Sequence, residues 1–179
     1  MERHAFVFNW ANNCIKINIL PKYLYLFQML PIPVPKLFFK QVNSCLTQFI
    51  WRNKLPRIKL TVLQSPLEKG GLNIPNFEYF YWAAQVRAVW TWQAEQAHPP
   101  IWTQIEQHHL NKLKLESIPY ISCLNSLLAI TTNPITIHTY KIWQQVRKKT
   151  GCIQSIYDKS PFHLNPSLPK AFRDGITKP

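Results

Sequence analysis

Residues 31–50 read PIPVPKLFFKQVNSCLTQFI, and this stretch decides the fold class. The alternate prolines from Pro31 to Pro35 exclude a helix and favour an extended connector. From Pro35 onward, where proline suits a first helical position, apolar residues recur every three or four positions. These residues are Phe38, Val42, Cys45, Leu46, Phe49 and Ile50. The pattern predicts an amphipathic helix over residues 35–52.

The segments on either side also predict helices. Upstream, apolar residues at helical spacing predict a helix over residues 12–30, with a kink or a restart at Pro21 because proline costs a helix interior ~3 kcal/mol. Downstream, a short helical turn is expected at 61–63, and Gly70-Gly71 predicts a tight turn. Asn76 is then expected to cap a helix over residues 77–92 that is apolar on nearly all sides.

The second half of the chain predicts shorter helices over 101–110 and 119–128, and a stronger one over 134–150 that ends at Gly151. Fifteen prolines against only four glycines disfavour a β-sandwich, whose turns are rich in glycine. We therefore expect an all-α chain: an irregular helical bundle with Pro-rich connectors and an extended, irregular C-terminal tail.

The charge of the chain points to a polyanionic partner. Twenty-one Lys and Arg residues face eight Asp and Glu residues, which gives a formal net charge of +13. Such an excess is typical of proteins that bind nucleic acid or an acidic membrane surface. The densest basic run is Arg52, Lys54, Arg57 and Lys59, and it contains no acidic residue. The competing interpretation of each of these residues is a solvated surface charge.

The carboxylates are too few and too scattered for metal-dependent catalysis. Two-metal polymerases and nucleases need several carboxylates within a few ångströms. The only aspartates are Asp158 and Asp174, and the six glutamates are isolated. The adjacent His108 and His109 point apart on a helix and are expected to face solvent. We therefore expect no catalytic residue, no metal ligand and no cofactor.

The cysteines and the hydropathy bear on location. Cys14, Cys45, Cys123 and Cys152 match no zinc-ligand spacing. No secretory signal is visible, which favours an intracellular chain with reduced thiols, in the nucleus or the cytoplasm. No uncharged apolar run approaches the ~18 residues that a membrane span needs, so no membrane association by a spanning helix is expected.

Ordered motifs over residues 16–94 carry a resemblance to a known family. They begin with residues 16–28 (KINILPKYLYLFQ) and continue with LPIPVPK at 30–36, FIW at 49–51 and PRIK at 56–59. GGL at 70–72, PNF at 75–77 and YWAAQVR at 81–87 complete them. In this order the motifs resemble the segment after the polymerase palm of LINE-type (non-LTR) retrotransposon reverse transcriptases. Residues 134–147, with Ile142-Trp143, resemble the region that follows.

The chain is expected to divide into four parts. The resemblance implies a thumb-like helical region over 16–94 and a helical C-terminal extension over 95–154, and four prolines with few apolar repeats predict an irregular tail over 155–179. Residues 10–14 (WANNC) stand where the family has a Gly-Arg pair and an aliphatic run, so residues 1–15 are expected to be a divergent leader. The catalytic aspartates and the endonuclease of the family lie in parts that this chain does not contain.

A non-catalytic fragment with residual, sequence-independent affinity for RNA or an RNA–DNA duplex is therefore the first hypothesis. The expected phosphate contacts are Lys36, Lys40, Arg52, Lys54, Arg57 and Lys59, with Lys16 and Lys22 as further candidates. The alternatives are a protein-interaction module, or a non-functional translated remnant, that exposes a former palm-packing surface to a protein partner.

The tryptophans divide between core and surface. Trp82, Trp90 and Trp92 lie on the segment that is apolar on nearly all sides, and they are expected in the core. Trp51 adjoins Arg52 and is the better candidate for a surface role, such as stacking on a base.

Overall fold

The protein is all-α. The computed structural model describes residues 2–94, 99–110, 113–121 and 123–151, with side chains from Phe8 onward, and no strand occurs among them. The chain forms two compact units, Met1–Ala84 and Gln85–Pro179, and the division falls within a helix. The tail predicted from residue 155 lies outside the described residues.

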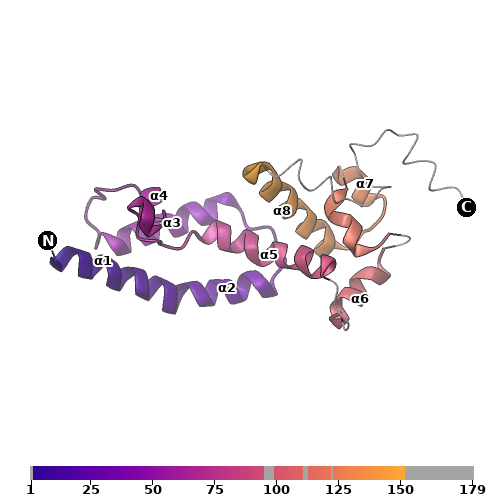
Figure 1. Cartoon of the computed structure of the whole chain (residues 1–179), viewed down its shortest axis with the longest axis horizontal. Helices are drawn as coiled ribbons and strands as arrows, with labels where there is room; N and C mark the ends of the chain where they lie inside the picture. The colour runs from indigo at the N-terminus through magenta and orange to yellow at the C-terminus, as the bar shows by residue number, and fades with distance from the viewer. Residues whose placement is uncertain (1, 95–98, 111–112, 122, 152–179) are drawn as a thin grey trace, which may run out of the picture. The chain divides into compact units, whose positions relative to one another are not determined.

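The helices of the first unit form an antiparallel hairpin with additions (Figure 1). A continuous helical run leads to the Pro-rich connector, and the next helix returns alongside it, in contact with the first helix of the run. The elements are α1 (Glu2–Cys14), a π-helical segment (Ile15–Ile19), α2 (Leu20–Met29), α3 (Lys36–Ile50), α4 (Leu60–Leu63), a 3₁₀ turn (Leu67–Lys69) and the start of α5 (Phe77–Gln93).

The predicted restart at Pro21 takes the form of the π-helical segment. The Leu20 amide donates to the carbonyl of Ile15, five residues earlier, and α2 then begins with Pro21 in its first turn. Ile15 and Leu20 are both buried although they are five residues apart, which a regular α-helix would not place on one face. The extra residue of the π turn restores the buried stripe.

The prediction that the first helix starts near residue 12 is wrong, because the helical run starts at Glu2. Residues before 12 lack an apolar stripe at helical spacing, so their sequence gave little sign of a helix. Tertiary contacts hold this segment instead. Ala11 and Asn12 are buried, and the Asn12 side-chain amide donates to the Leu72 carbonyl at 2.6 Å.

The Pro-rich connector is fixed in place by one tyrosine. The Tyr81 hydroxyl donates to the Ile32 carbonyl at 2.8 Å and accepts from the Val34 amide at 3.3 Å. The Tyr81 ring packs against Phe27 and Phe39, with ring centroids 5.3 and 5.5 Å away. This contact anchors the connector to the core that α2, α3 and α5 share.

Helix α5 starts as predicted and is buried on one face only. The Asn76 side-chain oxygen accepts from the amides of Glu78 and Tyr79 at 3.1 and 3.2 Å, which confirms the cap. Of the three tryptophans expected in the core, Trp92 is buried, Trp82 is half-buried and Trp90 is 69% exposed. The prediction for Trp90 is wrong because the buried positions, 77, 81, 85, 89 and 92, form a single stripe that excludes it.

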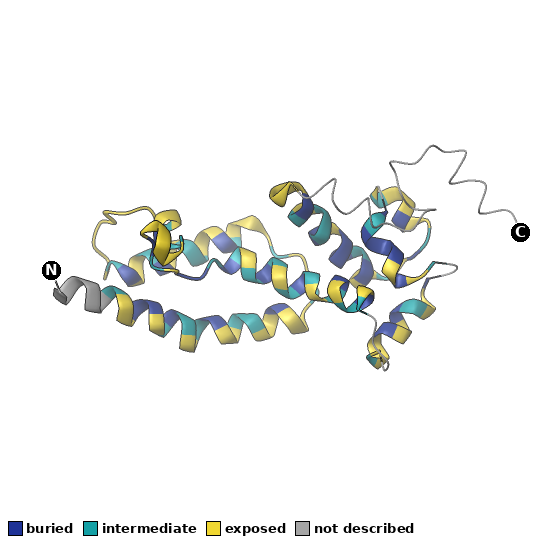
Figure 2. Cartoon of the chain, viewed as in Figure 1, coloured by how far each residue is buried: buried dark blue, intermediate teal, exposed yellow. Residues whose placement is uncertain are grey.

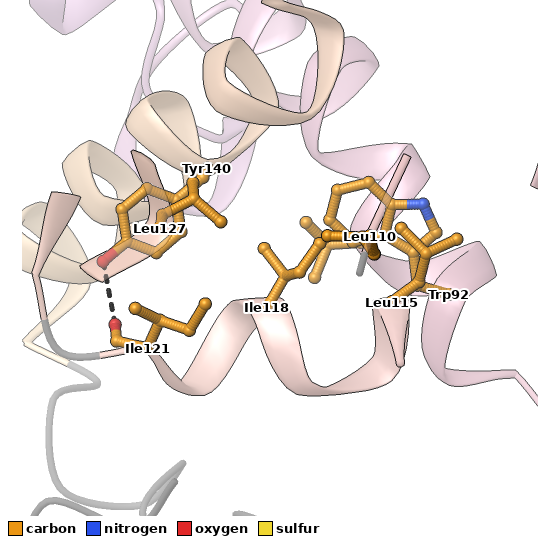
Figure 3. Close-up of a cluster of buried hydrophobic side chains, with 8 residues drawn as sticks. Trp92, Leu110, Leu115, Ile118, Ile121, Leu127 and Tyr140 are labelled. Carbon is orange, nitrogen blue, oxygen red and sulfur yellow. Dashed lines mark hydrogen bonds between the residues drawn. The ribbon is translucent and has the colours of Figure 1, made fainter. Parts of the chain in front are cut away.

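The second unit surrounds a compact apolar cluster (Figure 3). Its elements are the end of α5, α6 (Ile101–His108), a 3₁₀ helix (Leu115–Tyr120), α7 (Leu124–Leu128) and α8 (Pro134–Thr150). The helix predicted over 119–128 is wrong as a single element, because Pro119 lies in the 3₁₀ helix and Cys123 has extended backbone. Leu127 is fully buried, and the Tyr140 hydroxyl donates to the Ile121 carbonyl at 2.8 Å.

Helix α8 has the predicted bounds and ends at Gly151, whose φ of +68° is left-handed. Asn133 caps its start by accepting from the Ile135 amide at 3.0 Å. Two α8 side chains, Trp143 and Arg147, donate to the Pro119 carbonyl at 3.0 and 3.4 Å. Arg147 is thus buried against the 3₁₀ helix, whereas Lys148 and Lys149 in the same turn are exposed.

One buried carboxyl group in the second unit makes stability depend on pH. Glu106 accepts from the Trp92 indole N–H at 2.9 Å, and burial raises the pKa of Glu106 above its ordinary value. The folded state therefore binds a proton at a higher pH than the unfolded state does. The stabilising contribution of this protonation is complete below the unfolded pKa and is lost as pH rises through the folded pKa.

We expect Glu106→Gln to remove this pH dependence, because the neutral amide keeps an acceptor for Trp92. Urea unfolding at several pH values measures it. The free energy of unfolding of the wild type, minus that of the variant, should rise as pH falls from neutral toward the ordinary carboxyl pKa. A difference in the free energy of unfolding that does not change with pH would show that burial does not raise the pKa of Glu106. His138, whose pKa burial lowers, is common to both proteins and cancels.

Candidate nucleic-acid interface

All six predicted phosphate-binding residues are exposed. Lys36 and Lys40 lie on the first two turns of α3, and Arg52, Lys54, Arg57 and Lys59 lie in the loop between α3 and α4. We call residues 52–59 the basic loop, and every one of them is exposed (Figure 2).

The structure separates the six residues into two groups at opposite ends of α3. Lys36 and Lys40 are four residues apart and share one face of the helix. Lys40 lies ten positions before Ile50, the last residue of α3, which is about 15 Å along the helix axis. This separation corresponds to about four steps of 3.4 Å along one strand of a duplex. The two groups can therefore contact separate phosphates of one backbone.

The turn that starts the basic loop has unusual backbone geometry. Arg52 and Asn53 both have positive φ, of +50° and +60°. The Asn53 amide donates to the Gln48 carbonyl at 2.8 Å and the Arg52 amide to the Phe49 carbonyl at 3.2 Å, a pattern that ends a helix. Glycine normally occupies such positions, and a left-handed conformation costs other residues about 1–2 kcal/mol. The helix therefore ends at Ile50 and not at 52 as predicted.

Replacing Arg52 with glycine should change stability and binding in opposite directions. Arg52→Gly is expected to raise the free energy of unfolding by about 1 kcal/mol, because glycine adopts positive φ freely. It should also lower duplex affinity about tenfold at 0.1 M salt, because one phosphate contact is lost. Urea unfolding and filter binding measure the two effects. Asn53→Gly is the control, since it relieves strain without removing charge; equal binding losses in both variants would contradict a phosphate contact at Arg52.

The electrostatic environment of this unit is almost free of negative charge. No Asp or Glu occurs between Glu2 and Glu68, a stretch of 65 residues with nine Lys and Arg. Lys22 is exposed on α2, whereas Lys16 is half-buried and lines a cavity of about 680 Å³ with Gln64, Asn76 and Tyr79. Because no carboxylate in this stretch offsets them, the cations at both ends of α3 together create a positive electrostatic potential.

The aromatic residues near the basic loop differ from those expected. Trp51 is half-buried, its ring packs edge-on against Phe8 with centroids 5.2 Å apart, and its indole N–H is buried. Trp10, on α1, is 52% exposed and lies beside Phe49, with centroids 6.1 Å apart. Trp10 has no predicted role, because it belongs to the segment expected to be a divergent leader. Its position beside the basic loop depends on the packing of α1 against α3, a tertiary contact that the local sequence does not indicate.

Other site types have little support in the described part of the chain. His108 and His109 are both exposed, as predicted. No group of three His, Cys, Asp or Glu residues there is placed to hold a metal ion. None of the helices described is both long and apolar enough to cross a membrane. No model of a known protein family matches the chain.

Proposed function

We propose that this chain is a non-catalytic piece of a LINE-type reverse transcriptase that binds the backbone of RNA or an RNA–DNA duplex without reading sequence. The observation that carries the binding proposal is the exposure of all six predicted cations within a 65-residue stretch that has no carboxylate. The ordered motifs over residues 16–94 support the origin in the thumb-like region of that family.

Several features favour backbone contacts over base readout. The six cations are lysines and arginines on a helix end and a loop, and such side chains on phosphates fix position but carry no sequence information. The two groups lie at opposite ends of α3, so they can contact phosphates several nucleotides apart on one strand but cannot both contact the same base pair. Binding of this kind should be dominated by the release of counterions and should weaken steeply with salt.

Filter binding of the full chain to an RNA–DNA duplex at rising salt tests the proposal. Six phosphate contacts predict a slope of log K against log salt of about −5. A duplex of unrelated sequence should give the same slope and affinity. Absence of binding at low salt, or a slope near zero, would overturn the proposal.

An exposed apolar surface favours a second candidate, a protein-interaction module. Large apolar side chains are exposed around the turn from α2 to α3. They are Tyr25, Leu26, Met29, Leu30, Ile32 and Leu37. Size-exclusion chromatography distinguishes this candidate. Association that rises with protein concentration and disappears in Met29→Gln/Leu37→Gln would favour it, whereas a monomer at all concentrations would count against self-association through this surface.

A further inference from the structure

A hollow lies beside the basic loop, at the end of α3. It measures about 400 Å³ and is lined by Trp10 and Ala11 of α1, by Cys45, Gln48, Phe49 and Ile50 of α3, and by Arg52 and Asn53. Two of its walls are exposed aromatic rings, since Trp10 is 52% and Phe49 is 40% exposed. The hollow is within the volume range of small-molecule sites.

We infer that this hollow binds one unpaired nucleotide of an RNA or DNA strand, with its base on Trp10 and its phosphate on Arg52. Exposed aromatic rings next to a cationic groove are the combination that single-strand binding surfaces use. The Trp10 and Phe49 ring centroids lie 6.1 Å apart and their planes are inclined by 32°, so the two rings are neighbours with similar orientations. Both rings are partly exposed, so a base can stack on the exposed part of Trp10.

Charge and backbone geometry identify the occupant. Arg52 and Asn53 hold left-handed backbone conformations at the rim, where glycine would be unstrained. An arginine here supplies a planar donor that matches phosphate, and an asparagine amide supplies a donor and an acceptor for a base edge. The nearest stretch of chain contains no carboxylate that would repel a phosphate. An acidic peptide would use the cations but has no need of the paired aromatic rings.

The bases of a duplex are already stacked and paired, so the ligand must be a single strand or an overhang. The assignment of a nucleic acid as the ligand rests on the proposed function. The presence of the hollow and of its exposed aromatic rings is independent of that proposal. The two proposals also differ in their salt dependence. Phosphate contacts set the salt slope, while stacking shifts the affinity by the same factor at every salt concentration.

Cys45 lines the hollow and provides a direct test on the unmodified chain. Cys45 is exposed, and Cys123 in the second unit is another exposed cysteine, whose sulfur lies 3.0 Å from the Ser126 hydroxyl oxygen. An unpaired RNA of roughly eight nucleotides, within the size range of single-strand sites, should slow alkylation of Cys45 and leave Cys123 unaffected. The DNA strand of the same sequence should protect to a similar extent. Equal alkylation rates at Cys45 with and without saturating oligonucleotide would overturn the inference.

Variants then assign the effect to the ring. Trp10→Leu should lower affinity for the unpaired strand about five- to a hundredfold, the range that loss of base stacking produces, with no change in salt slope. Affinity for a blunt duplex should stay the same. The matched control is Trp90→Leu, which removes an indole that is 69% exposed in the second unit and should have no effect.

The outcomes separate the two proposals. Duplex binding with a steep slope, combined with no effect of Trp10→Leu on the unpaired strand, would sink the nucleotide site and leave the proposed function standing. If single-strand binding depends on Trp10 but no duplex binding is seen, the nucleotide site would stand and the proposed function would be overturned. If Trp10→Leu does not fold, as circular dichroism would show, Cys45 protection in the wild type still decides.

Discussion

Neutralising the basic loop is expected to lower affinity for an RNA–DNA duplex by roughly three to four decades at 0.1 M salt. The variant carries Arg52→Gln, Lys54→Gln, Arg57→Gln and Lys59→Gln. Each phosphate contact contributes about 0.9 to the slope of log K against log salt, so four lost contacts reduce a slope of about −5 to about −2. The four residues are exposed, so their replacement should alter stability little.

A second variant tests whether both ends of α3 contribute. Lys36→Gln/Lys40→Gln removes the other group and should reduce the slope to roughly −4. Because the two groups lie at opposite ends of α3, about 15 Å apart along the helix axis, their effects on log K should add when all six residues are replaced. A slope that falls to zero when either group alone is removed would show that binding requires one concerted surface.

The matched control keeps the same net charge as the loop variant. Lys114, Lys141, Lys148 and Lys149 are exposed in the second unit, and their replacement by Gln also lowers the formal net charge from +13 to +9. This control should retain most of the affinity and most of the slope. Equal losses in the two variants would mean that net charge, and not the basic loop, drives binding.

Much of this arrangement could be predicted from the sequence where local signals were strong. The periodic stripes placed α3 and α8, and side-chain chemistry identified the cap at Asn76 and the helix end at Gly151. The separation of Lys36 and Lys40 from the basic loop also follows from the length of the predicted helix between them. These features depend on residues that are close in sequence.

The features that could not be predicted depend on contacts between distant segments. Helix α1 is held by the bond from Asn12 to Leu72, sixty residues away, and Trp10 reaches the basic loop only because α1 contacts α3. Trp90 was misplaced for a related reason. A helix that is apolar on nearly all sides still buries a single face if the available core covers only that face. Composition indicates that a helix is buried but does not show which side.

The Pro-rich connector shows how a local signal and a distant contact combine. Alternate prolines leave only two backbone amides between Pro31 and Pro35, those of Ile32 and Val34. The Ile32 amide donates to the Leu30 carbonyl at 2.9 Å, and the Val34 amide donates to Tyr81. The connector therefore has no unpaired amide, and it can turn the chain from α2 into α3 beside the core.

Gly71→Ala is expected to destabilise the first unit by about 3 kcal/mol or more. A Cβ atom at Gly71 would overlap the Ser65 carbonyl and would lie 2.8 Å from the Val62 carbonyl oxygen. Both neighbours are backbone, so no flexible side chain can move aside, and overpacking of this kind costs at least 1–3 kcal/mol. The backbone around it is tied down: the Leu72 and Ile74 amides donate to the Leu63 carbonyl at 3.0 and 3.2 Å.

Gly70→Ala provides the comparison within the same turn. Gly70 has a φ of +77° with nothing within 4 Å of a Cβ, so alanine there should cost only about 1 kcal/mol for its left-handed conformation. Urea unfolding of the full chain measures both variants. Because Leu72 also accepts the bond from Asn12, loss of the turn should release α1, which carries Trp10. Affinity for a single strand should therefore fall in Gly71→Ala and stay unchanged in Gly70→Ala. Similar losses of stability in the two variants would mean that glycine is required for its backbone conformation and not for the close contact of Gly71 with the Ser65 carbonyl.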